Sequence, residues 1–185
     1  MAKVLVPLSE GFEDIEAVTI IDVLRRGGVE VVTAAIGDSR EVEAAHGITM
    51  RADARFADVG NDDYDAIILP GGGKGTQNLK ACEALTERLK RQKESGKWLC
   101  AICAAPTVLV AAEVLDPDVH VTCYPSCRSE LDREWSPAPV VVDGKVITGQ
   151  APGSALLFAL IVLQELVDPV VAGKVAIGLV TDVLG

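Results

Sequence analysis

Short apolar runs alternate with amphipathic segments along most of the chain, and this alternation restricts the fold more than any other feature. Lys3 to Leu8 is a strand-like run, and Asp14 to Arg26 follows with apolar residues at helical spacing before Gly27-Gly28. The same order begins again at Asp65 to Leu69 and at Trp98 to Ile102. Strands alternating with helices of this length predict an α/β fold with a largely parallel sheet and helices on both faces.

The remaining segments fit the same plan. Val29 to Ile36 is another β-branched run, Asn78 to Glu94 has the pattern of one amphipathic helix, and His46 to Asp58 alternates weakly, as short edge strands or loop would. Towards the carboxyl end we expect a short strand at His120 to Tyr124, a hairpin over Pro139 to Thr148 that turns at Asp143-Gly144, and helices at Ala155 to Val167 and Val170 to Leu179.

Length and charge limit the classes of partner. A chain of 185 residues with 49% hydrophobic residues is long enough for one well-cored domain, so we expect a single domain over residues 1–185. A formal net charge of −10 predicts no binding to nucleic acid and none to an anionic membrane surface. The first residues lack the long apolar core of a secretory signal, and five cysteines do not form a disulfide framework. We therefore expect a cytoplasmic protein with reduced thiols.

Cys103 lies where a strand-like run changes into a helical one. Pro106 is tolerated there only in the first turn of the helix, so Cys103 sits in a tight strand-to-helix turn of the nucleophile-elbow type. A helix start beneath the sulfur would lower the pKa of the thiol and favour the thiolate. The alternative at this point is a buried structural cysteine, which is equally common.

Two further loops end at the same predicted edge of the sheet, where α/β proteins bind ligands. Glu16 follows the first strand, and a carboxyl beside a thiolate would share a proton with it. The stretch from Pro70 to Gly75 could offer backbone N–H groups to an oxyanion or a phosphate, although its lysine is misplaced for a Walker A loop. The alternatives are acids that favour a helix start and a flexible glycine-rich connection.

The other cysteines and the histidines carry weaker signals. Cys100 and Cys103 have C-x-x-C spacing, but strand alternation would send them to opposite faces, which disfavours a zinc site or a thioredoxin-type site. Cys123 or Cys127 could still act as a resolving partner for Cys103. His46 in a loop and His120 at the opposite end of the sheet are expected to be surface residues, so no Cys–His dyad is predicted.

Five segments together carry a family resemblance: EGFEDIE, LPGGGKGTQNL, AICAAPTVL, TCYP and GQAPGSALLFAL. In order and spacing they resemble the ThiJ/PfpI superfamily, on its DJ-one-like branch. The resemblance implies a flavodoxin-like fold and a homodimer. It also implies that Cys103 is a nucleophilic, oxidation-prone cysteine, that Glu16 is its acid partner, and that Gly72 and Ala104 supply backbone N–H groups to an oxyanion.

The same resemblance implies two classes of function. One is a glutathione-independent glyoxalase or deglycase that acts on small reactive α-oxoaldehydes or their adducts, with no metal and no organic cofactor. The other is a redox-sensing protective protein or chaperone in which an oxidant converts Cys103 to sulfinic acid. Tyr124 stands where some members have histidine and is a candidate binding residue, but it is a poor general base near neutral pH. Ala104 stands where protease-like members have histidine, so a peptidase is not expected.

Overall fold

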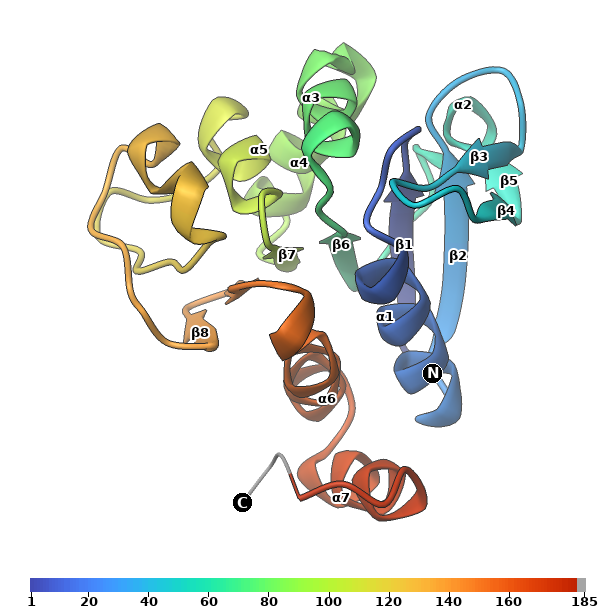
Figure 1. Ribbon diagram of the computed structural model, residues 1–185, viewed down its shortest axis with the longest axis vertical. Coiled ribbons are helices and arrows are strands. Elements are labelled where there is room, and N and C mark those ends of the chain that lie inside the picture. Colours follow the sequence, from blue (N-terminus) through green and yellow to red (C-terminus); the bar gives the residue numbers. More distant parts are fainter. Residues whose placement is uncertain (183–185) are drawn as a thin grey trace.

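The computed structural model describes residues 1–182 and has a seven-stranded sheet at its centre (Figure 1). All neighbouring strands of this sheet pair in parallel except β8 with β9. The predicted α/β fold with a largely parallel sheet is therefore confirmed. In spatial order the strands are β5 (Ala54–Arg55), β2 (Glu30–Ala35), β1 (Lys3–Leu8), β6 (Ala66–Leu69), β7 (Trp98–Ile102), β9 (Val146–Gly149) and β8 (Val140–Asp143).

The order of the central strands decides where a ligand can reach the sheet. Counted along the chain, β1, β2, β6, β7 and β9 are arranged 2-1-3-4-5, which is the flavodoxin-like order. The direction of winding reverses between β1 and β6, so the connections that follow these two strands lead to opposite faces of the sheet, and α/β folds bind ligands at the carboxyl ends of the strands at such a point. The loops after β1, β6 and β7 meet at this edge.

Helices cover both faces of the sheet (Figure 1). Within β1, Val4 and Val6 pack into one hydrophobic cluster and Leu5 packs into the other, as the alternation of side chains along a strand requires. The first cluster lies under α1 (Asp14–Arg26), α6 (Ala155–Leu166) and α7 (Pro169–Gly178), and the second under α2 (Phe56–Val59), α3 (Gly73–Ala81), α4 (Glu83–Glu94) and α5 (Pro106–Ala111). Each buried Val, Leu or Ile side chain contributes about 1.5–3 kcal/mol to this packing.

Two predicted elements are wrong. The helix expected over Asn78 to Glu94 is two helices, because Cys82 adopts an extended backbone (φ −85°, ψ 95°) between α3 and α4. The strand expected at His120 to Tyr124 is reduced to one bridge between Val121 and Trp135. The neighbouring N–H groups bond elsewhere, that of Thr122 to Thr148 Oγ1 at 2.9 Å and that of Tyr124 to the carbonyl of Cys103 at 2.7 Å.

The weakly alternating region has the short elements that its pattern indicates. It contains β4 (Thr49–Arg51), β5 and α2, and β4 pairs with β3 (Glu41–Glu43) in a small antiparallel hairpin that was not predicted. The hairpin expected at Asp143-Gly144 is confirmed as β8 and β9, with Gly144 at φ +56° in the turn. Among residues 1–182, no helix combines the length and the hydropathy needed to span a membrane.

Candidate functional site

Cys103 adopts a left-handed backbone conformation, with φ +63°, between β7 and α5. For a residue with a Cβ this conformation costs on the order of 1–3 kcal/mol and persists only where the surroundings enforce it. Two hydrogen bonds enforce it here. The Cys103 N–H donates to the carbonyl of Gly149 at 2.9 Å, and the Cys103 carbonyl accepts from the Tyr124 N–H at 2.7 Å. The strand, turn and helix predicted around this residue are therefore present.

The left-handed turn also corrects the expected placement of the two C-x-x-C cysteines. Strand alternation predicts opposite faces, yet Cys100 and Cys103 both belong to the hydrophobic cluster under α1 and α6. The alternation stops at Ile102 because the backbone reverses at Cys103. Within residues 1–182 the cysteines nevertheless form no group of three or more that could hold a metal ion. A resolving role for Cys123 or Cys127 stays a prediction.

Glu16 lies on the first turns of α1, is completely buried, and meets Cys103 across Gly71. Its Oε2 accepts a hydrogen bond from the Gly71 N–H at 2.7 Å. A Cβ built on Gly71 would lie 2.7 Å from the Cβ of Cys103 and 2.8 Å from Glu16 Oε2. Only glycine leaves room for the acid and the thiol to approach each other, so Gly71 is a site residue that the sequence analysis did not single out.

The other glycines of this loop allow two loops to pack tightly. Gly72 has φ +95°, and a Cβ there would lie 2.3 Å from the carbonyl oxygen of Gly11 in the loop after β1. Hydrogen bonds join the same loops: the Glu13 N–H donates to the Gly71 carbonyl at 3.0 Å, and the Gly75 N–H to the Gly11 carbonyl at 3.1 Å. The glycine-rich stretch is thus a fixed junction instead of a flexible connection.

Burial and charge act on the pKa values of Glu16 and Cys103 together. Burial raises the pKa of Glu16 to about 7, while hydrogen bonds from the Gly71 N–H and with Cys103 act against that rise. Burial also raises the pKa of the Cys103 thiol, and a charged Glu16 adds to this effect. The backbone N–H groups of Ala104 and Gly72 face the sulfur and lower the pKa of the thiol. The sequence predicted only a lowering by the helix start, and α5 is a short helix of six residues.

The remaining candidate residues occupy different surroundings. Ala104 is buried beside Cys103, and Tyr124 is 43% exposed with its backbone N–H bonded to the elbow. His46 and His120 are exposed, and each pairs with an aspartate, Asp14 and Asp143 respectively, instead of with Cys103. The prediction that both histidines are surface residues is confirmed.

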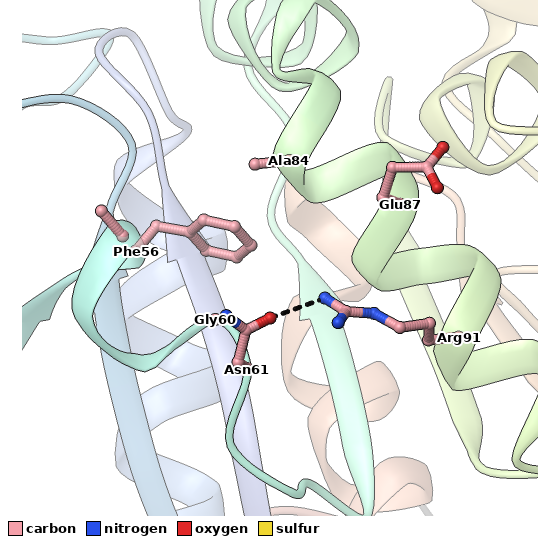
Figure 2. A pocket seen from close by; sticks show the side chains of 7 residues that line it. Phe56, Gly60, Asn61, Ala84, Glu87 and Arg91 are labelled. Atoms are coloured by element: carbon pink, nitrogen blue, oxygen red, sulfur yellow. Dashed lines mark hydrogen bonds between the residues drawn. The ribbon is translucent and has the colours of Figure 1, made fainter.

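A small hollow of about 240 Å³ lies beside the candidate site. It is lined by Glu10, Gly11, Gly73 and Lys74 and by the β3–β4 hairpin at Glu43 to Ala45. A separate cavity of about 290 Å³ lies between α2 and α4, where Arg91 donates a hydrogen bond to Asn61 Oδ1 at 2.9 Å (Figure 2). None of the candidate residues lines either cavity, but the hollow of about 240 Å³ adjoins the elbow through Gly73, the neighbour of Gly72.

These features define an α/β protein with a largely parallel sheet, in which a cysteine in a strand-to-helix elbow lies beside a buried glutamate. The DJ-1/PfpI family matches residues 2–165, and the chain belongs to this family. "Glutathione-independent glyoxalase DJR-1.2" of Caenorhabditis elegans is 38% identical over 172 residues, which cover 91% of this chain and 89% of that protein. The solved structure "Toxoplasma gondii DJ-1, oxidized" is 38% identical, with a TM-score of 0.94, and 98% of this chain and 99% of that chain are covered.

"Protein DJ-1 homolog B" of Arabidopsis thaliana is 36% identical over 171 residues, which cover 89% of this chain. The match covers 38% of that protein, and a match to a second Arabidopsis relative covers 42% of it. The chain thus spans about two fifths of the length of these two relatives.

Gly72→Ala and Gly73→Ala form a matched pair that tests the loop junction. Alanine at Gly72 would need a strained φ and would strike the Gly11 carbonyl, whereas a Cβ at Gly73 meets nothing within 4 Å. We expect Gly72→Ala to lower the free energy of unfolding by about 2–4 kcal/mol and Gly73→Ala to change it by less than about 1 kcal/mol. Urea denaturation of both variants gives the comparison, and equal stabilities would contradict the tight junction.

The buried acid makes stability depend on pH. The pKa of Glu16 is about 7 in the folded chain and ordinarily 4.5, so the stability that it contributes is complete below about 4.5 and is lost as pH rises through 7. Relative to Glu16→Gln, the wild type should lose about 2–3 kcal/mol of unfolding free energy between pH 5 and pH 8. Urea denaturation at both pH values measures this difference. Parallel pH profiles for the two proteins would show that the proton is not held at this position.

Proposed function

We propose that the chain is a cysteine-dependent, glutathione-independent glyoxalase or deglycase that acts on small α-oxoaldehydes or their adducts. The observation that carries the proposal is the convergence of three groups at one buried point: the Cys103 sulfur, the Glu16 carboxyl, and the N–H groups of Gly72 and Ala104. The name of the C. elegans relative supports the same reaction class. Nucleophile, proton carrier and oxyanion donors are the parts that this chemistry requires.

An unpaired oxygen supports one location for the shared proton. Glu16 Oε1 is buried and has no hydrogen-bond partner, while Cys103 lies close enough to affect the pKa of the carboxyl. An ionised carboxylate would leave this oxygen both charged and unsatisfied, which is costly in a buried site. A protonated Oε1 would instead donate to the sulfur. We therefore propose that Glu16 keeps the proton and Cys103 the negative charge. The amides of Gly72 and Ala104 favour this arrangement because they lower the pKa of the thiol, whereas burial and an ionised Glu16 raise that pKa and oppose it.

The reaction can then proceed without a metal or an organic cofactor. The thiolate forms a C–S bond to the aldehyde carbon, the carbonyl electron pair moves to oxygen, and the resulting oxyanion accepts hydrogen bonds from Gly72 and Ala104. The oxyanion takes the Glu16 proton. The Glu16 carboxylate then removes the proton of the first substrate carbon and delivers it to the second, while the hydroxyl proton passes to the second oxygen, so that the first carbon is oxidised and the second reduced. Water then hydrolyses the thioester, releases an α-hydroxyacid such as lactate, and regenerates the thiol.

A second candidate function is a redox-responsive protective role with little turnover. It is favoured by the absence of a histidine near Cys103, since His46 and His120 pair with aspartates and Tyr124 occupies the TCYP position. Peroxide would add oxygen to the sulfur to give sulfenic and then sulfinic acid, and protonated Glu16 would hydrogen-bond the product. Intact mass spectrometry after mild peroxide treatment distinguishes this role by a selective gain of two oxygens at Cys103.

The proposal includes a homodimer in the cytoplasm. Ile15 and Val18 on α1 are 57% and 48% exposed, and Ile48 on the neighbouring β3–β4 turn is 53% exposed. This turn packs on the start of α1, since the Ala45 N–H donates to the carbonyl of Phe12 at 2.8 Å. A second copy of the chain would remove these apolar side chains from water.

Lactate formation from methylglyoxal tests the enzymatic proposal. We expect Cys103→Ser to lower kcat/KM by at least about 10³-fold and Glu16→Gln by at least about 10²-fold, because one removes the thiolate and the other the proton carrier. Cys82→Ser is the matched control, since Cys82 is a half-buried thiol between α3 and α4, and it should retain wild-type turnover. Unchanged turnover in Cys103→Ser would contradict the proposal.

A further inference from the structure

Three metal-ligating side chains meet outside the candidate site, at the start of α1. Glu13 and Asp14 come from the loop and first turn of this helix, and His46 comes from the turn between β3 and β4. One ligand atom of each residue lies within 4.8 Å of the other two. In the sequence the acids resemble ordinary helix-start residues and His46 a surface loop residue, and 32 positions separate Asp14 from His46.

The distances within this cluster fit a small divalent cation. His46 Nδ1 lies 2.9 Å from Asp14 Oδ2 and 3.7 Å from Glu13 Oε2. Two ligands about 2.0–2.2 Å from a tetrahedral zinc ion are about 3.4 Å apart, and the two observed separations bracket this value. Small side-chain rotations would therefore place the three atoms around one ion, with a water molecule as fourth ligand.

Asp14 provides a second, independent indication. Its side chain is only 7% exposed, and its Oδ2 faces His46, where it accepts hydrogen bonds from Nδ1 and from the backbone N–H at 3.1 Å. The other oxygen, Oδ1, is buried and has no hydrogen-bond partner. A buried carboxylate oxygen without a donor is costly, and a bound cation would satisfy the carboxylate.

The charge of the cluster also favours a cation. The positive end of a helix is equivalent to roughly half an elementary charge, which is less than the two negative charges that Glu13 and Asp14 carry when ionised. Glu13 is itself nearly buried, with 11% of its side chain exposed, so these charges lie close together with little water between them. One imidazole nitrogen with two carboxylates suits zinc and similar transition metals better than magnesium or calcium, which prefer all-oxygen sites.

We propose that Glu13, Asp14 and His46 form a binding site for a divalent transition-metal ion of the zinc type. The ion would join the β3–β4 hairpin to the start of α1. Its role is distinct from the chemistry at Cys103, because none of the three ligands belongs to the thiol, acid and amide set of the candidate site. The site therefore does not depend on the proposed glyoxalase reaction.

The chain contains a matched control for this proposal. His120 makes the same pair of contacts to Asp143 Oδ2, with its backbone N–H at 2.9 Å and Nδ1 at 3.0 Å, and both histidine side chains are about equally exposed, at 70% and 68%. In the described chain no third ligand joins the His120–Asp143 pair in such a group. A metal ion that needs three protein ligands should choose His46.

Zinc titration of the full chain, followed by NMR of the histidine ring nitrogens, tests the site directly, since the chain has two histidines. We expect one equivalent of Zn²⁺ to shift the His46 ring resonances and to leave those of His120 in place. In calorimetry, His46→Gln and Glu13→Gln should each weaken Zn²⁺ binding at least tenfold, while His120→Gln and Cys103→Ser should bind as the wild type does.

Several results would overturn the proposal. Zinc held by thiols would leave the His46 ring resonances unchanged and would be lost in cysteine variants instead. Equal shifts at His46 and His120 would show unspecific binding to exposed imidazoles. An unchanged Zn²⁺ affinity in His46→Gln would also show that His46 is not a ligand. Because His46 is exposed, this variant should fold normally. Failure of lactate formation would leave the zinc result intact, so the two proposals fail separately.

Discussion

The left-handed backbone at Cys103 is the constraint on which the candidate site depends. It ends the alternation of β7, turns the sulfur towards α1, and brings the N–H of Ala104 to face it. The cost of this conformation is offset by the hydrogen bonds to Gly149 and Tyr124, which come from β9 and from the segment after α5. The TCYP and GQAP segments are thus tied to the elbow through their backbones, whatever side chains they carry.

The second requirement is close approach of the loops after β1 and β6. These loops flank the winding reversal of the sheet, and Gly71 and Gly72 let them come together without a Cβ between Glu16, Cys103 and Gly11. The result is a buried thiol and a buried acid that share one environment. Burial raises the pKa of both groups, and each group also affects the pKa of the other. This coupling, and not a strong helix dipole, sets the protonation states at the candidate site.

Periodicity in the sequence was sufficient to predict much of the fold. The bounds of β1 and α1 match their predicted ranges, and the strand–helix alternation predicted the parallel sheet. Other features depend on contacts between distant segments. The break at Cys82 and the loss of the strand near Val121 come from backbone geometry and from hydrogen bonds to remote residues. The burial that sets the pKa of Glu16 and the meeting of His46 with Asp14 have no local signal, because both arise only when the loops pack.

The central claim is that Glu16 keeps the shared proton while Cys103 carries the charge. The rate of Cys103 alkylation against pH, followed by intact mass in the wild type and in Glu16→Gln, tests it most directly. If Glu16 donates to the thiolate, an amide is a weaker donor, and Glu16→Gln should raise the pKa of Cys103. Glu10→Gln, at an exposed residue paired with Lys74, should leave that pKa unchanged. A fall in the pKa of Cys103 in Glu16→Gln would mean that Glu16 is the ionised partner, and it would contradict the account.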